Sequence, residues 1–187
     1  MFIITALAAM PIQIKGLQIK MMKLIHYTGK PIESLERRCY KQNDMCFQAK
    51  PTGLWISVEG TERFPDNYTW KEWCESEGFA IENLAFSYEV ILADVANILH
   101  LKTSDDINEF TKLFPLKSRH WPEEIDTYQL DWNSVKEKYQ GIIISPYQWD
   151  CRLNCDNGWY YGWDCSSGCI WDIGCIKEFN LMKEEGE

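Results

Sequence analysis

The sequence predicts an α+β fold in a single domain. Short apolar or alternating runs, which are typical of strands, outnumber the segments with helical periodicity. These runs do not alternate regularly with helices, as the strands of a doubly wound parallel sheet would. The chain has 187 residues, which suits one domain, and no internal repeat or low-complexity linker divides it.

The expected strands are short runs rich in β-branched, aromatic or other apolar residues and bounded by turn residues. The first is followed by Gly29-Lys30-Pro31 and the second is preceded by Lys50-Pro51-Thr52-Gly53. The continuous run GIIIS, residues 141–145, predicts a buried strand. The full set is 23–28, 54–58, 86–92, 97–101, 141–145, 159–163 and 168–172.

Helix signals are fewer. Thr69 followed three residues later by Glu72 is a capping-box pattern, which predicts a helix that runs to about Glu77. Thr103 precedes a second helix, whose apolar residues Ile107, Phe110 and Leu113 recur at helical spacing. We further expect a helix over residues 131–139 and a short one over residues 33–38.

The first residues of the chain differ from the rest. Residues 1–10 are apolar, but they lack the positive start of a secretory signal and are too short to span a membrane. The organised pattern begins near Met22. We therefore expect residues 1–21 to be an extension outside the core, residues 22–187 to form the domain, and the protein to be cytoplasmic without a membrane partner.

Charge and cysteine content limit the classes of function. A formal net charge of -9 disfavours tight sequence-blind binding to nucleic acid, but it leaves nucleic acid open as a briefly held substrate. The 8 cysteines include no CxxC pair and no nearby histidine that completes a zinc pattern. We expect free, mostly buried thiols and no metal; a disulfide or a metal site are the alternatives.

Aromatic residues are abundant, and they suit either a core or a ligand pocket. The chain contains 9 Trp and is 14% aromatic. The stretch WYYGWDCSSGCIWD, residues 159–172, is expected to be two strands joined by a turn, with some aromatic side chains in the core and some at a pocket. A hairpin that serves only the core is the alternative. No GxGxxG or Walker sequence is present.

Two short motifs carry a family resemblance. LIHYTG, residues 24–29, followed by KPTGLWIS, residues 50–57, resembles the opening of the ADP-ribosyltransferase superfamily, including its DNA-modifying toxins and the RNA 2′-phosphotransferases. The resemblance is strongest over residues 23–57. It implies an ADP-ribosyltransferase-like fold of mixed, mainly antiparallel sheets with peripheral helices, and NAD as a substrate.

The resemblance also implies roles for individual residues. His26 would form a hydrogen bond to the NAD ribose and act in catalysis. Tyr27 and Thr28, beside it, would also belong to the NAD-binding residues. Trp55 would form a wall against the nicotinamide, and Ser57 would meet its carboxamide.

The catalytic acid departs from the family pattern. The family's glutamate begins a late strand, yet no Glu occurs between Glu137 and Glu178. Asp164 lies just before the last apolar run and is the expected acid, while Glu89 and Asp150 are alternatives. The other residues expected to bind NAD are Tyr147, Trp163 and Ser167.

The expected function is therefore an NAD-dependent mono-ADP-ribosyltransferase that modifies a protein or nucleic-acid acceptor and releases nicotinamide. A carboxylate suits this chemistry because cleavage passes through an oxocarbenium-like state. One alternative is a catalytically silent domain of this fold that binds a nucleotide or a partner. Others are an unrelated aromatic-rich binding or structural protein, in which His26 belongs to the core, and a cysteine-based metal or redox protein.

Overall fold

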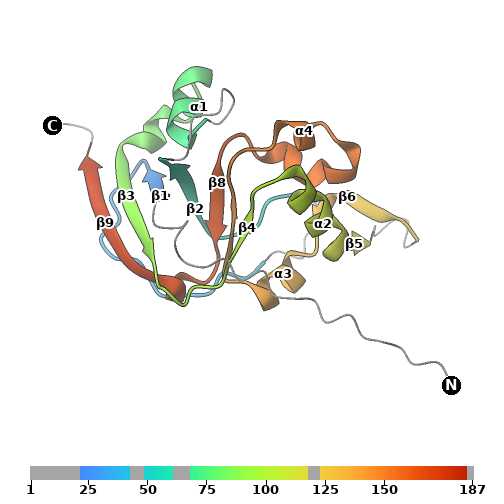
Figure 1. Ribbon diagram of the computed structural model, residues 1–187. Coiled ribbons are helices and arrows are strands. Elements are labelled where there is room, and N and C mark those ends of the chain that lie inside the picture. The colour runs from blue at the N-terminus through green and yellow to red at the C-terminus, as the bar shows by residue number, and fades with distance from the viewer. Residues whose placement is uncertain (1–21, 43–48, 61–67, 118–122, 185–187) are drawn as a thin grey trace.

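The fold is a mixed α+β arrangement built on one mostly antiparallel sheet (Figure 1). The computed structural model describes residues 22–42, 49–60, 68–117 and 123–184. The 7-stranded sheet has the order β4-β7-β8-β2-β1-β3-β9, and β4 with β7 is its parallel pair. The strands are β1 (Lys23–Thr28), β2 (Leu54–Glu59), β3 (Phe86–Leu92), β4 (Ile98–Leu101), β7 (Gly141–Ile144), β8 (Ser167–Ile170) and β9 (Ile176–Glu184).

Helices flank this sheet in two places. Figure 1 shows α1 near the ends of β1 and β2, whereas α2, α3 and α4 gather on the other side with the β5–β6 ribbon. In the described ranges no helix is long and apolar enough to cross a membrane. The elements are α1 (Trp70–Glu77), α2 (Ser104–Leu113), α3 (Trp132–Lys138), α4 (Trp149–Arg152), β5 (Pro115–Lys117), β6 (Ile125–Leu130) and the 3₁₀ helices η2 (Ile81–Leu84), η3 (Cys155–Gly162) and η4 (Ile173–Cys175).

The starts of both predicted helices are confirmed, and a threonine caps each of them. The Thr69 side chain accepts from the Glu72 N–H at 3.2 Å, and the Glu72 carboxylate accepts from the Thr69 N–H at 3.0 Å. Thr103 forms the same reciprocal pair with Asp106 at the start of α2. These bonds satisfy backbone N–H groups that have no partner within the helix. Local sequence thus fixes where both helices begin.

The two faces of the sheet bury different side chains. One face carries aliphatic residues such as Leu24, Ile56 and Val90. The other packs an aromatic core, which includes Trp132 and Trp159, against α2, α3, α4 and η3. Because successive side chains of a strand point to opposite faces, each strand contributes to both.

Two predicted elements are wrong. Residues 159–163 do not form a strand, because Trp159 and Tyr160 lie within the 3₁₀ helix η3, which Asn154 caps through its side chain. Residues 33–38 form no helix. The chain just beyond them pairs instead with the stretch after β8, where the Tyr40 N–H donates to the Trp171 carbonyl at 2.7 Å.

The structure also contains elements that were not predicted, namely β5, β6, β9, α4, η2 and η4. β9 is the longest of the sheet strands, with 9 residues, and it pairs with β3 at the edge of the sheet. The predicted extension, residues 1–21, lies outside the described residues.

Candidate functional site

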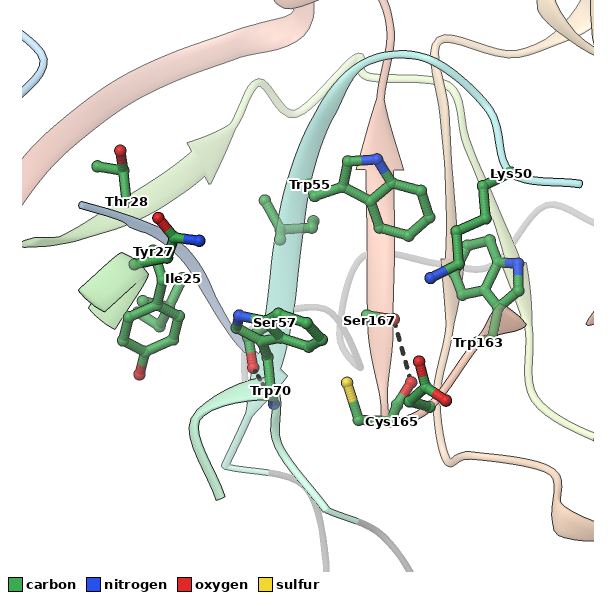
Figure 2. Close-up of a pocket in the computed structure, with 13 residues that line it drawn as sticks. Ile25, Tyr27, Thr28, Lys50, Trp55, Ser57, Trp70, Trp163, Cys165 and Ser167 are labelled. Carbon is green, nitrogen blue, oxygen red and sulfur yellow. Dashed lines mark hydrogen bonds between the residues drawn. The ribbon is translucent and has the colours of Figure 1, made fainter. Parts of the chain in front are cut away.

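A cavity of about 380 Å³ opens on the face of the sheet that carries the aromatic core. It lies over β1, β2 and β8, between α1 and the segment after η3. Figure 2 shows its side chains surrounding one central space. Its lining residues come from distant parts of the chain: Ile25, Tyr27, Thr28, Lys50, Trp55, Ile56, Ser57, Trp70, Asn83, Trp163, Asp164, Cys165 and Ser167.

Strand register explains why these side chains meet. Ser57 of β2 lies directly opposite Ile25 of β1 and Ser167 of β8. Residues opposite one another on neighbouring strands point to the same face. At the start of β2 a glycine permits the close approach of β8, because a Cβ at Gly53 would lie 2.5 Å from the Ile170 carbonyl oxygen.

The cavity has aromatic walls. The rings of Trp55 and Trp163 contact each other with centroids 4.9 Å apart and planes inclined at 58°. Trp70, at the start of α1, contributes another wall and stacks on Trp73 at 5.3 Å. Such flat apolar surfaces suit a planar aromatic ligand.

Two buried hydroxyl groups line the cavity, and both already hold protein groups in place. The Ser57 hydroxyl accepts from the Trp70 N–H at 3.0 Å, which ties the first turn of α1 to β2. Because this bond uses an oxygen lone pair, the hydroxyl proton of Ser57 remains available to a ligand. The Ser167 hydroxyl donates to the Cys165 carbonyl at 3.0 Å.

Asp164 is the carboxylate of the lining, and Arg152 holds it in place. The Arg152 Nη2 atom lies 2.9 Å from Asp164 Oδ1, and both side chains are about one-fifth exposed. Arg152 Nη1 also donates to the Tyr147 hydroxyl at 3.2 Å, and that hydroxyl donates to the Trp163 carbonyl at 2.6 Å. Tyr147 itself lies outside the lining, and its hydroxyl connects the Trp163 wall to Arg152, the partner of Asp164.

Tyr27 and Thr28 border the cavity on the β1 side (Figure 2). The Tyr27 hydroxyl donates to Glu59 Oε1 at 2.6 Å. Burial, together with this carboxylate, raises the pKa of Tyr27 above its ordinary value. The phenol therefore stays protonated at physiological pH, and its hydrogen is engaged by Glu59.

His26 does not line the cavity. It lies between Ile25 and Tyr27 on β1, so its side chain points to the opposite face of the sheet. There its Nδ1 atom is 2.7 Å from the Trp55 carbonyl oxygen, and its ring lies 6.1 Å from that of Phe179. Burial lowers the pKa of His26. His26 therefore contacts the backbone of Trp55 from the side of the sheet opposite the cavity.

The alternative acids lie elsewhere. Glu89 stands opposite Ile25 across β1 and β3, outside the lining, and its carboxylate is 4.0 Å from the Lys23 ammonium. Asp150 is exposed on α4 and also lies outside the lining. Of these three acids, Asp164 lines this cavity and the other two do not.

Sequence reasoning missed several lining or supporting residues, among them Lys50, Trp70, Asn83 and Arg152. Lys50 stands at the start of the KPTGLWIS motif and could have been found there. Burial lowers the pKa of Lys50, and the nearby Asp164 carboxylate partly opposes that shift. Nothing in the sequence around Arg152 indicates its pairing with Asp164.

The cysteines of the described ranges are all unpaired: Cys39, Cys74, Cys151, Cys155, Cys165, Cys169 and Cys175. Cys165 lines the cavity, but burial raises the pKa of its thiol to about 12. A thiol with that pKa is protonated and weakly nucleophilic at physiological pH. No group of metal-ligating side chains occurs within the part of the chain that the structure describes.

Comparisons of the chain with protein-family models, with curated proteins and with solved structures found no match.

Proposed function

We propose that the protein is an NAD-dependent mono-ADP-ribosyltransferase that transfers ADP-ribose to a protein or nucleic-acid acceptor and releases nicotinamide. The observation that carries this proposal is the convergence of three separate segments on one cavity. Most of the residues singled out from the sequence for an NAD site contribute to the lining, namely Tyr27, Thr28, Trp55, Ser57, Trp163, Asp164 and Ser167, whereas His26 and Tyr147 do not.

The shape and chemistry of the cavity fit the nicotinamide end of NAD. A volume of about 380 Å³ lies near the lower end of the usual range for small-molecule sites, about 300–1,000 Å³. Trp55 and Trp70 offer flat surfaces for the pyridine ring. The proton of the Ser57 hydroxyl can be donated to the carboxamide oxygen. The rest of the dinucleotide would then extend toward the open side of the cavity.

The proposed reaction breaks the bond between C1′ of the ribose and the nicotinamide nitrogen. Both electrons of that bond leave with nicotinamide, and the acceptor supplies the electron pair of the new bond to C1′ and loses its proton. Positive charge develops on the ribose in the transition state. The Asp164 carboxylate can stabilise this charge, and its pairing with Arg152 fixes the orientation of the carboxylate.

That ion pair also favours a second candidate function. Arg152 already neutralises Asp164, so the field that this carboxylate exerts on the ribose is weaker than that of an unpaired acid. A domain of this kind would bind a nucleotide without cleaving it. NAD affinity and nicotinamide release must therefore be measured separately.

The test compares wild type with Asp164→Asn. The substitution keeps the size of the side chain and removes its charge. We expect NAD affinity by calorimetry to persist, while nicotinamide release falls about 100- to 1,000-fold, the usual cost of losing one well-placed electrostatic group. Asp156→Asn is the matched control, because Asp156 is exposed and lies outside the lining.

The outcomes separate the candidates. NAD binding to wild type without nicotinamide release would favour the silent domain. Release that survives in Asp164→Asn would remove this residue from the chemistry, and Glu89→Gln and Asp150→Asn would then be tested. No NAD binding to wild type at all would refute the proposed function. Thermal unfolding of each variant shows whether the loss of the Arg152 pair has only destabilised the fold.

A further inference from the structure

Lys50 places a cation inside the cavity. The residue precedes the turn into β2 and is half-buried, and Figure 2 shows its ammonium directed into the space between Trp55 and Cys165. Its Nζ atom lies 5.3 Å from the centroid of the Trp55 ring, a cation–π distance. A lysine that served only solubility would instead extend into solvent.

Packing along its stem holds this side chain in place. Lys50 runs past Gly162, where an added Cβ would lie 3.0 Å from Lys50 Cε and within 4 Å of Cγ and Cδ. The stem therefore occupies the room that the missing side chain of Gly162 leaves. A long flexible side chain confined between Gly162 and Trp55 loses less freedom when it binds a ligand.

Among the described residues Lys50 takes part in no ion pair. The Asp164 carboxylate lies near enough to act on Lys50, but its ion pair is with Arg152. The lining therefore holds one cation, Lys50, and one carboxylate, Asp164, whose charge Arg152 already offsets from outside the lining. A lysine ammonium in such a cavity, in a chain with a net charge of -9, can bind an anion.

We propose that Lys50 is an anion-binding residue that contacts the phosphate groups of a nucleotide bound in this cavity. The assignment of the anion to the pyrophosphate of NAD rests on the proposed function, whereas the anion site itself does not. Lysine binds phosphate as a point charge. The partial desolvation that lowers the pKa of Lys50 also strengthens its attraction to an anion, because the surrounding dielectric is low.

Calorimetry with three probes tests the inference: NAD, nicotinamide riboside, which lacks phosphate, and sodium pyrophosphate. Lys50→Met keeps the apolar stem and removes the charge. We expect this variant to bind NAD and pyrophosphate about 10- to 100-fold more weakly, and nicotinamide riboside with nearly unchanged affinity. Lys71→Met is the control, because Lys71 is exposed on α1 and pairs with Glu75.

The results distinguish failure of the anion site at Lys50 from failure of the proposed function. If wild type binds pyrophosphate through Lys50 but does not bind NAD, the anion site stands and the proposed function fails. If NAD binds equally well to wild type and Lys50→Met, the function stands and the inference is overturned. If none of the probes binds, both are overturned. Lys50→Gln serves as the second variant should thermal unfolding show that the methionine variant does not fold.

Discussion

Two neighbouring groups of aromatic side chains lie on the same face of the sheet and differ in what they contact. In the core group, Trp159 meets Phe110 and Trp132 edge to face at 5.5 and 5.8 Å, and Trp159 is 0% exposed. In the cavity group, Trp55 contacts Trp163 and is only partly buried. Protein covers the core rings and also Trp163, which is 1% exposed, whereas Trp55 keeps a surface for a ligand. Substitutions in the core group should therefore mainly lower the stability of the fold, and substitutions in the cavity group should mainly lower the affinity for a ligand.

The largest expected effect is on stability, from Trp159→Ala. This change removes a fully buried ring and leaves the Thr111 hydroxyl without the indole N–H that donates to it at 2.8 Å. We expect the free energy of unfolding to fall by about 3–5 kcal/mol, measured by denaturant titration. Trp149→Ala is the control, because Trp149 is 46% exposed. Equal losses in both variants would show that the burial of Trp159 in the core group is not what stabilises the fold.

A smaller effect on binding is expected from Trp55→Leu. The leucine keeps an apolar side chain but removes the flat wall, so the affinity for NAD should fall by about 1–3 kcal/mol, the range for loss of one stacking partner. The free energy of unfolding should change much less than in Trp159→Ala. Calorimetry and denaturant titration measure the two quantities, with Trp149→Leu as the control. A pure loss of stability at unchanged affinity would assign Trp55 to the core.

The smallest effect is expected from His26→Gln, which probes the contact between His26 and the Trp55 carbonyl on the face of the sheet opposite the cavity. Burial lowers the pKa of folded His26 below its ordinary value of about 6.5, so the unfolded chain binds the proton more readily. The contribution of His26 to stability is therefore complete above pH 6.5 and is lost as the pH falls toward the folded pKa. In the variant, the melting temperature should depend less on pH over this acidic range.

The same variant tests the role that the resemblance gives to His26. An amide can still donate to the Trp55 carbonyl, so we expect NAD affinity to stay nearly unchanged. His100→Gln is the control, because burial also lowers the pKa of His100, whose Nε2 contacts the Ser145 carbonyl. Lost NAD binding with an unchanged melting profile would place His26 in the site after all.

Much of the sheet could be predicted because its central strands carry strong local patterns. The continuous apolar run of β7 and the turn residues around β2 both indicate strands directly. β9 was missed because IKEFNLMKE mixes charged and apolar residues, as an edge strand with one exposed side can. The aromatic run after Gly158 was misread because aromatic residues favour strands, while Asn154 starts a helix that burial of Trp159 and Tyr160 supports.

The sequence predicts many residues of the candidate site, but it does not predict which way their side chains point. Trp55 and Ser57 alternate on one strand and both reach the cavity, as the pattern of the motif suggests. His26 and Tyr27 are adjacent within β1 and point to opposite faces of the sheet, and the sequence does not reveal which of them faces the cavity. Arg152 could not be found at all, because its pairing with Asp164 depends on how α4 and η3 fold back on each other.

The register of β2 with β8 has a consequence for how the protein is made. Ser57 and Ser167 are partners in the sheet although most of the chain separates them. During synthesis, β1, β2 and β3 emerge early and can pair among themselves, but the wall formed by Trp163 and β8 arrives only near the end. Closing such long loops slows folding. The nascent chain therefore carries half a cavity, with Trp55 exposed, until its last quarter has left the ribosome.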